Sequence, residues 1–532
     1  MAQALTKWMA AQSVRQFDGS VAPAFAGVWA IFGHGNVAGL GEALYAERDV
    51  LPTFRGHNEQ GMAHAAIAYA KQMNRRRMMA VTSSIGPGAT NMITAAALAH
   101  VNRLPVLFLP GDVFADRRPD PVLQQVEDFA DGTVSANDCF RPVSRYFDRI
   151  TRPEQLLQSL PKAMSVLTDP AACGPVTLSL CQDVQAESYE FPDRFFAPRI
   201  WEIRRQRPDE AEIAEAIAAL KQAKRPLIIA GGGVRYSGAS GALADFAAGA
   251  GIPVAATQAG KSVMPEAHPN YVGSLGVTGS TAANTLAAAA DVVLSIGSRL
   301  QDFTTGSNGL IKGRIFALNV QLHDAIKHDA ATVLGDALVG LEALAAGVDG
   351  YHMEYGFSCM GYEVAAGIGV HMAAPDRPNI VFAGDGSYLM MNSELATAVM
   401  MGTSMTLVIT DNRGFGCINR LQAATGGAAF NNLLADSHHE VLPDIDFVAH
   451  AAALGARAEK AGSIAELEAM VAKAVRRDGV DVIVIDTDPG PSTEAGGTWW
   501  DVAVPAVSTR DTVTAAYKNY QTGRQRQDKG NK

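Results

Sequence analysis

The chain has 532 residues, which is too long for one hydrophobic core and predicts about three domains. Its composition, 48% apolar and 18% charged with 51 glycines, is typical of a globular protein with many tight turns and excludes a disordered chain. A formal net charge of −10 offers no basic surface for phosphate backbones, so we expect no nucleic-acid partner.

Cysteine spacing and hydropathy limit the possibilities further. The five cysteines form no CxxC pair, so we expect neither a disulfide framework nor a structural zinc site. The N-terminal residues contain no continuous apolar segment, and no apolar run reaches the roughly 20 residues that a bilayer crossing needs. We therefore expect a soluble, cytoplasmic protein without a membrane partner.

Short apolar runs alternate with helical patterns in the first third of the chain. The runs that predict strands lie at 27–32, 78–82, 105–109 and 176–180. This alternation is typical of a parallel, doubly wound sheet, and we expect a first domain over residues 1–190. The segment from Glu190 to Pro208 carries prolines and arginines without periodicity, which predicts a linker.

A second α/β unit is expected over residues 205–348. Its predicted strands lie at 226–230, 253–256, 292–296 and 314–319. Three glycines, Gly231 to Gly233, follow the first of these strands, as in many dinucleotide-binding turns. The GxGxxG pattern is absent, however, and no acidic residue ends the next strand. A structural turn is therefore the favoured interpretation, and nucleotide binding stays open.

The third unit is expected over residues 351–515, followed by a tail at 516–532. Strands are predicted at 380–383, 406–410 and 482–486. The first leads into Gly384-Asp385-Gly386-Ser387, and the second ends at Asp411-Asn412-Arg413-Gly414. Open α/β sheets bind ligands at the carboxyl ends of their strands, so we expect both polar loops at one site. The whole chain thus predicts an α/β protein of three doubly wound domains with mostly parallel sheets.

The two polar loops contain the ligands that magnesium prefers. Asp385 offers a carboxylate, Asn412 an amide oxygen and Gly414 a backbone carbonyl, and Mg²⁺ commonly completes its octahedron with phosphates and water. The glycines that flank Asp385 would let a diphosphate approach the backbone, and a helix expected to begin near Tyr388 would point its N–H groups at it. Either loop alone is an ordinary turn. Their spacing across a strand-helix-strand unit predicts a magnesium-bridged diphosphate.

This arrangement resembles the GDG…N motif of thiamine-diphosphate enzymes, which implies thiamine diphosphate and Mg²⁺ as cofactors. RGHNEQGMAHAAIAYAK resembles the pyrimidine-domain helix of acetohydroxyacid-synthase-like members, with Glu59 at the position of the activating glutamate. SSIGPGATN resembles their GPGxxN turn, and SCMGYEVAAG resembles the segment that supports the bent cofactor, with Met360 as the wedge under the thiazolium. The cofactor-binding residues that the resemblance implies are Glu59, Met360, Gly384, Gly386, Ser387 and Phe415, and the metal ligands are Asp385, Asn412 and Gly414.

A narrower resemblance concerns the substrate. IFGHGNVAG, PGDVFADRRPDPVLQQVE and DNRGFGCINRLQ are similar to the trihydroxycyclohexanedione hydrolase family, which opens a cyclic 1,2-dione in myo-inositol breakdown. Gly33-His34-Gly35-Asn36 stands where the synthases have a tyrosine-proline turn. The resemblance implies hydrolysis of a carbon–carbon bond to give 5-deoxy-glucuronate, with a small cyclic polyol dione as substrate. An acetolactate-synthase-type carboligase, which would share the same cofactor residues, is the alternative.

Glu59 is the expected catalytic carboxyl. Thiamine becomes a nucleophile when its own imino group removes the C2 proton, and a carboxyl that shares a proton with the pyrimidine ring stabilises that imino form. The small and apolar residues after Glu59 favour a buried setting for such a carboxyl. A glutamate at the start of a helix is by itself usually a cap or a dipole partner, so this assignment depends on the magnesium motif.

Other polar residues near these motifs are weaker candidates. We expect His34, in the Gly-rich loop after the first strand, to contact substrate hydroxyls or to relay a proton, and we count it as catalytic. A loop histidine bonded to the backbone is an equal alternative. His57, Asn58, Gln124 and Gln125 are similar candidates.

The third unit is expected to be shortened. The resembled family has a further strand and helix before YHMEYG, an element that needs roughly 30 residues. Here only two residues separate Val348 from Tyr351. An impaired homologue with weak cofactor binding is therefore another alternative.

The resemblance also implies an assembly. In the family, the activating glutamate and the metal site belong to different chains. We therefore expect a homodimer or homotetramer with its active site at the subunit interface.

Overall fold

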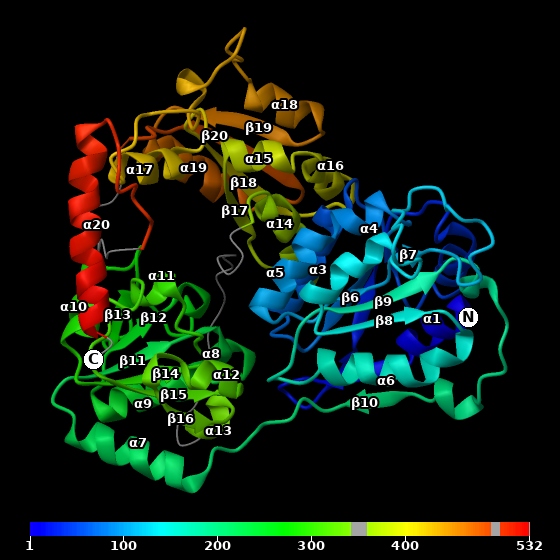
Figure 1. The fold of residues 1–532 in the computed structure, drawn as a ribbon, viewed down its shortest axis with the longest axis horizontal. Helices are drawn as coiled ribbons and strands as arrows, with labels where there is room; N and C mark the ends of the chain where they lie inside the picture. The colour runs from blue at the N-terminus through cyan, green and yellow to red at the C-terminus, as the bar shows by residue number, and fades with distance from the viewer. Residues whose placement is uncertain (342–358, 491–500, 531–532) are drawn as a thin grey trace. The chain divides into compact units, whose positions relative to one another are not determined.

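The computed structural model describes residues 1–341, 359–490 and 501–530 (Figure 1). The chain divides into two compact units. Unit 1 comprises 1–204, 356–411 and 443–487, and unit 2 comprises 205–355, 412–442 and 488–532. The expected junction between Val348 and Tyr351 lies outside the described residues. None of the helices formed by the described residues has the length and apolar content that crossing a bilayer requires.

The first sheet of unit 1 is parallel throughout. Its strands are β3 (Phe25–Ala30), β4 (Thr53–Phe54), β5 (Met78–Thr82), β6 (Leu107–Phe108), β7 (Gly111–Asp112), β8 (Tyr146–Ile150) and β9 (Val176–Cys181). They lie in the order β4-β3-β5-β6-β9-β7, with β8 paired to β9. Helices α3 (Glu59–Gln72) and α5 (Ile93–Asn102) cover one face, and α6 (Leu156–Leu167) covers the other (Figure 1). Helices on both faces bury β9 along its whole length, as expected for a doubly wound sheet.

Helix α3 is enclosed by protein on nearly all sides. Every residue from Gly61 to Lys71 is buried. The helix packs against α14 (Tyr362–Ala373) so closely that a Cβ at Gly369 would lie 2.1 Å from the Ala65 carbonyl oxygen. Small side chains permit this approach, and the close packing holds α3 in one place within unit 1.

A second sheet in unit 1 has four parallel strands. They are β17 (Ile380–Gly384), β18 (Met405–Asp411), β19 (Arg457–Ala461) and β20 (Val480–Asp486), in the order β17-β18-β20-β19. Gly384 pairs in register with Thr410, so the segments that follow β17 and β18 leave the sheet from the same edge. This is the edge at which an open parallel sheet binds its ligand.

Unit 2 contains a six-stranded parallel sheet. Its strands are β11 (Pro226–Ala230), β12 (Val254–Ala256), β13 (Tyr271–Ser274), β14 (Val292–Ile296), β15 (Arg314–Asn319) and β16 (Ala331–Leu334), in the order β13-β12-β11-β14-β15-β16. Alternate residues of β11 enter different cores, with Ile228 and Ala230 in one and Leu227 and Ile229 in the other. A strand buried on both faces in this way confirms the predicted α/β fold class.

The segment that we expected to be a linker has secondary structure. It forms a 3₁₀ helix at Asp193–Phe196 and β10 (Arg199–Trp201), which pairs in parallel with β1 (Gln12–Arg15). Strand β2 (Val21–Pro23) completes this small sheet. Trp201 is buried, and its indole N–H donates to Gln12 Oε1 at 3.0 Å. The boundary between the two units, at 204/205, falls in this segment, but its first part is ordered, because burial of an aromatic side chain orders a segment that has no hydrophobic period.

Candidate functional site

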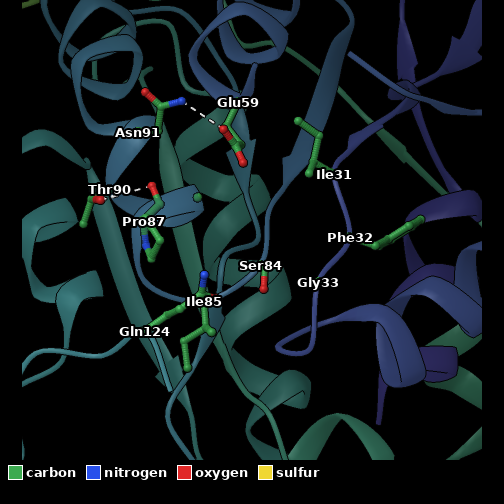
Figure 2. A pocket seen from close by; sticks show the side chains of 11 residues that line it. Ile31, Phe32, Gly33, Glu59, Ser84, Ile85, Pro87, Thr90, Asn91 and Gln124 are labelled. Atoms are coloured by element: carbon green, nitrogen blue, oxygen red, sulfur yellow. Dashed lines mark hydrogen bonds between the residues drawn. The ribbon is translucent and has the colours of Figure 1, made fainter. Parts of the chain in front are cut away.

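A cavity of about 640 Å³ lies at the carboxyl ends of β3 and β5 in unit 1 (Figure 2). Its lining residues all come from positions 31–124. Ligand pockets in proteins commonly measure roughly 300–1,000 Å³, so the cavity has the size for a small molecule or part of a cofactor. Ile31, Ile85 and Pro87 make part of the wall apolar, and Glu59 is the ionisable side chain among the residues that line it.

Glu59 is positioned by the start of α3. The preceding residue, Asn58, caps this helix by accepting a hydrogen bond from the Gly61 N–H at 3.1 Å. The Glu59 Oε2 accepts a bond from Asn91 Nδ2 at 2.9 Å, and Figure 2 shows the amide directed at the carboxylate. A Cβ at Gly88 would lie 3.0 Å from Glu59 Oε1, so the glycine keeps the second oxygen accessible. The sequence pointed to Glu59 but not to Asn91, although this residue ends the GPGATN motif.

Gln124 lines the cavity, and its hydrogen-bond partner is His34, which does not line the cavity itself. His34 Nε2 is 3.1 Å from Gln124 Oε1, and Gln124 lines the cavity opposite Glu59 in Figure 2. The backbone is tight here, because Gly86 has φ +64° and a Cβ on it would lie 1.7 Å from the Gln124 carbonyl oxygen. His34 therefore bonds to a side chain, and not to the backbone as one interpretation of the sequence had it.

The other weak candidates have structural partners. Gln125 Oε1 accepts a bond from the Ala136 N–H at 3.0 Å, and His57 Nδ1 lies 2.8 Å from Thr397 Oγ1. Neither residue lines the cavity. Their side chains are held by these partners, and a role for them at the site stays a prediction.

The candidate diphosphate loop follows β17 at the ligand-binding edge of the second sheet. Gly384 is extended (φ −73°, ψ 156°), and helix α15 (Asp385–Met390) begins at the next residue. The expected helix start near Tyr388 was wrong, because Gly384 is the N-cap residue and the backbone is helical from Asp385 onwards. Tyr388 is instead an interior residue of this helix. Its side chain is buried in the protein, and its hydroxyl lies 2.9 Å from His450 Nδ1. Asp385 is 4% exposed and starts the helix.

Two further residues of this loop were predicted to bind cofactor. Gly386 lies within α15 and is half-buried. The Ser387 hydroxyl lies 2.8 Å and 2.9 Å from the two carboxylate oxygens of Glu363, to which it donates, and it accepts a bond from the Gly361 N–H at 2.9 Å. Ser387 thus joins α15 to the start of α14.

Met360 stands two residues before the start of α14 and is 39% exposed. In unit 2, Phe415 is the N-cap residue of α17 (Gly416–Ala424). Gly414 has φ +149° and forms an antiparallel bridge with Leu433. A Cβ at Gly414 would lie 2.4 Å from the Asn432 carbonyl oxygen, so this position requires glycine.

The predicted metal ligands lie on segments that follow neighbouring strands. Asp385 belongs to unit 1, whereas Asn412 and Gly414 belong to unit 2, so their convergence on one ion stays a prediction. Residues 1–341, 359–490 and 501–530 contain no group of three or more His, Cys, Asp or Glu side chains that could hold a metal. The predicted donor set is of a different kind, with one carboxylate, one amide and one backbone carbonyl.

Sequence comparison finds three domain families along the chain. Residues 26–131 match the N-terminal TPP binding domain of thiamine pyrophosphate enzymes. Residues 213–344 match the central domain, and residues 343–485 match the C-terminal TPP binding domain. The three matches include residues of both units.

Curated relatives align with almost the whole chain. The 3D-(3,5/4)-trihydroxycyclohexane-1,2-dione hydrolase of Geobacillus thermodenitrificans (strain NG80-2) is 40% identical over 623 residues, covering 98% of this chain and 97% of the relative. The proteins of the same name from Bacillus anthracis (strain A0248) and Bacillus cereus (strain AH820) are each 38% identical over 626 residues, with 97% of both chains covered. Since the first alignment spans 623 positions and this chain has 532 residues, at least 91 positions are gaps on its side. Together, the three domain matches and the nearly full-length similarity establish that the chain belongs to the thiamine pyrophosphate enzyme family.

Proposed function

We propose that the chain is a thiamine-diphosphate- and Mg²⁺-dependent hydrolase that opens the ring of 3D-(3,5/4)-trihydroxycyclohexane-1,2-dione to 5-deoxy-glucuronate in myo-inositol catabolism. The observation that carries this proposal is 40% identity, over 98% of the chain, to a relative named for that activity. The cavity beside Glu59 adds a physical argument, since it presents one carboxylate in a partly apolar wall.

The pyrimidine end of the cofactor fits the cavity beside Glu59. An aromatic ring needs apolar walls and a few oriented polar groups, which Ile85 and Glu59 offer. Asn91 holds one carboxylate oxygen of Glu59 and leaves the other beside Gly88. Glu59 would share a proton with the pyrimidine ring through that second oxygen.

The diphosphate end fits the turn between β17 and α15. Apart from the adjoining backbone, no atom of the described residues lies within 4 Å of a Cβ built on Gly384, so a phosphate has room to approach the backbone. Asp385 presents a buried carboxylate at the carboxyl end of β17, where it would bind Mg²⁺ together with Asn412 and the Gly414 carbonyl. Met360, Gly386, Ser387 and Phe415 would complete the cofactor site.

When bound, thiamine diphosphate supplies the carbon nucleophile and the electron sink that cleavage between two carbonyl carbons needs. The chain's own residues bind and orient the substrate. Gln124, which lines the cavity, and His34, which is bonded to Gln124, would bind the ring hydroxyls of a polyol, and His34 would relay a proton. Water completes the hydrolysis by adding to the carbonyl that leaves as the carboxylate.

The active site would lie between two chains. Among the described residues, those that line the cavity beside Glu59 come from positions 31–124, and none of the proposed diphosphate or metal ligands is one of them. A second copy of the chain would bring its Asp385 loop to this cavity. The functional unit is therefore a homodimer, which can pair into a tetramer.

One observation favours a second candidate, a homologue with weakened cofactor binding. At least 91 alignment positions are gaps in this chain, and its C-terminal sheet has four described strands. If these gaps include the strand and helix expected before Tyr351, their loss would reduce cofactor affinity. Measured uptake of thiamine diphosphate separates this candidate from the first.

The test compares wild type with Asp385→Ala and Glu59→Gln. Isothermal titration with thiamine diphosphate and Mg²⁺ reports cofactor affinity, and ring opening of the dione reports activity. Asp385→Ala should weaken cofactor binding by more than the roughly 10- to 100-fold that loss of an outer-shell metal partner costs. Glu59→Gln should keep the cofactor and lose turnover by roughly 100-fold or more, because the shared proton is lost.

Pyruvate is the control substrate. Formation of acetolactate from pyruvate, without ring opening of the dione, would show that the chain is a carboligase and would contradict the proposed hydrolase activity. Wild type that takes up no cofactor at micromolar concentrations would favour the second candidate, and equal activity of all three proteins would contradict the assignment of both residues.

A further inference from the structure

Glu394 is a buried carboxyl outside the motifs discussed so far. It lies on α16 (Ser393–Met400) in unit 1 and is 1% exposed. Burial raises the pKa of Glu394, and the polar groups around the carboxyl offset only part of that rise. An ionisable side chain is costly to bury, so its position against neighbouring elements is informative.

The Glu394 carboxyl lies against the backbone on both sides of Glu59. A Cβ at Gly61 would lie 2.7 Å from Glu394 Cδ and 3.0 Å from its Oε1. On the other side, the backbone N–H groups of His57 and Asn58 face the carboxyl and lower its pKa. One side chain of α16 therefore contacts the residues before and after the proposed catalytic glutamate.

A second contact connects the same two elements. Thr397, one turn after Glu394 on α16, places its hydroxyl 2.8 Å from His57 Nδ1 and also faces the Glu394 carboxyl. Asn58 in turn caps α3 by accepting from the Gly61 N–H. Glu394 and Thr397 of α16 thus contact the segment from His57 to Gly61. The carboxyl of Glu59 itself is bonded to Asn91.

We propose that Glu394 is a positioning residue for Glu59, whose carboxyl holds the first turn of α3 so that Glu59 points into the cavity. The inference rests on the proposed function, since it needs Glu59 to act on the cofactor. Glu394 does not line the cavity, so it acts through the backbone and not by contact with substrate. A displacement of about 1 Å at a reacting group can cost roughly 100-fold in rate. A residue that does not touch the substrate can therefore control turnover by fixing the position of Glu59.

The experiment compares wild type with Glu394→Ala, Glu394→Gln and Leu395→Ala. Leu395 is the neighbouring residue on α16 and is fully buried, so its truncation is the matched control for loss of packing in the same helix. Hydrogen exchange of the segment 55–61 is measured in cofactor-free protein, which gives a readout independent of activity. Steady-state kinetics with the dione then give kcat and KM.

Glu394→Ala should speed exchange in 55–61 and lower kcat by roughly 10- to 100-fold with little change in KM. Glu394→Gln keeps an oxygen at the same place and should restore both values towards wild type. Leu395→Ala should unfold at a lower temperature with exchange in 55–61 and kcat near wild type.

Two results would overturn the proposal. One is wild-type exchange in 55–61 for Glu394→Ala, and the other is equally fast exchange in Leu395→Ala. If wild type itself fails to open the dione ring, the proposed function fails, and the exchange data still decide whether Glu394 holds the turn.

Discussion

His64 lies wholly inside the protein where α3 meets α14. Burial lowers its pKa to about 3, so the imidazole is neutral in the folded state. Its Nε2 is 3.8 Å from Cys359 Sγ, and the ring meets the Tyr362 ring edge-on at 5.5 Å between centroids. A thiol is a weak partner, and neither contact stabilises a positive charge. His64 is therefore a structural residue, and the folded protein disfavours its protonated form.

This burial predicts how stability depends on pH. The folded-state pKa of His64 is below the unfolded value of 6.5, so its contribution is complete above pH 6.5 and is lost as the pH falls towards 3. Below pH 6.5 the imidazole of His64 is protonated in the unfolded chain but not in the folded chain. The free energy of unfolding therefore falls by about 1.4 kcal/mol for each pH unit. Urea unfolding of wild type and His64→Leu at pH 7.5, 6.5 and 5.5 measures this slope.

The variant should lose less stability than wild type between pH 6.5 and pH 5.5. His439→Leu is the control, because His439 is exposed. Identical pH slopes for wild type and His64→Leu would contradict the prediction.

A substitution in the turn between β17 and α15 should change cofactor affinity without changing the stability of the fold. Gly384 has an ordinary extended backbone, and within the part of the chain that the structure describes a Cβ on it would contact only its own chain neighbours. Gly384→Ala should therefore unfold near the wild-type temperature, because the lower entropy of the unfolded chain offsets the poorer capping of α15 by alanine. The added methyl would occupy the space proposed for a phosphate, so affinity for thiamine diphosphate should fall.

Thermal unfolding and cofactor titration of Gly384→Ala check both expectations. Gly86→Ala is the contrasting variant, since its positive φ and the adjacent Gln124 carbonyl predict loss of stability. Unchanged cofactor affinity in Gly384→Ala would place the diphosphate elsewhere.

At the scale of the whole molecule, the proposed dimer predicts complementation between two inactive variants. Glu59→Gln and Asp385→Ala are co-expressed with different tags, and the mixed species is purified through both tags. If Glu59 and Asp385 of different chains form each site, every mixed dimer has one intact site and one doubly altered site. Before the mixed dimers are purified, roughly half of all dimers are mixed, and each of these has one of its two sites intact. The unpurified mixture should therefore reach roughly a quarter of wild-type activity.

If each site were formed within one chain, every site would lack one residue and the mixed dimers would stay inactive. Analytical ultracentrifugation of wild type provides the matching control for assembly. A monomer with full activity would contradict an interfacial site.

The elements with a clear hydrophobic pattern could be predicted from the sequence. The strands expected at 78–82, 226–230, 292–296 and 314–319 are β5, β11, β14 and β15 with the same bounds. Runs of apolar and β-branched residues determine such strands locally, because both faces of a parallel sheet are buried. The same reasoning missed β10, whose order depends on Trp201 packing against residues far away in the chain.

The sequence by itself determined the α/β class, the strand positions and Glu59 as the carboxyl to examine, because these depend on local pattern and on motif. Only the tertiary structure decided which polar groups meet. Asn91 reaches Glu59 across 32 positions, Gln124 reaches His34 across 90, and Thr397 reaches His57 across 340. Such contacts follow from how helices pack on sheets, which no local pattern encodes, and for the same reason Glu394 became visible as the residue beneath the first turn of α3 only once the chain was folded.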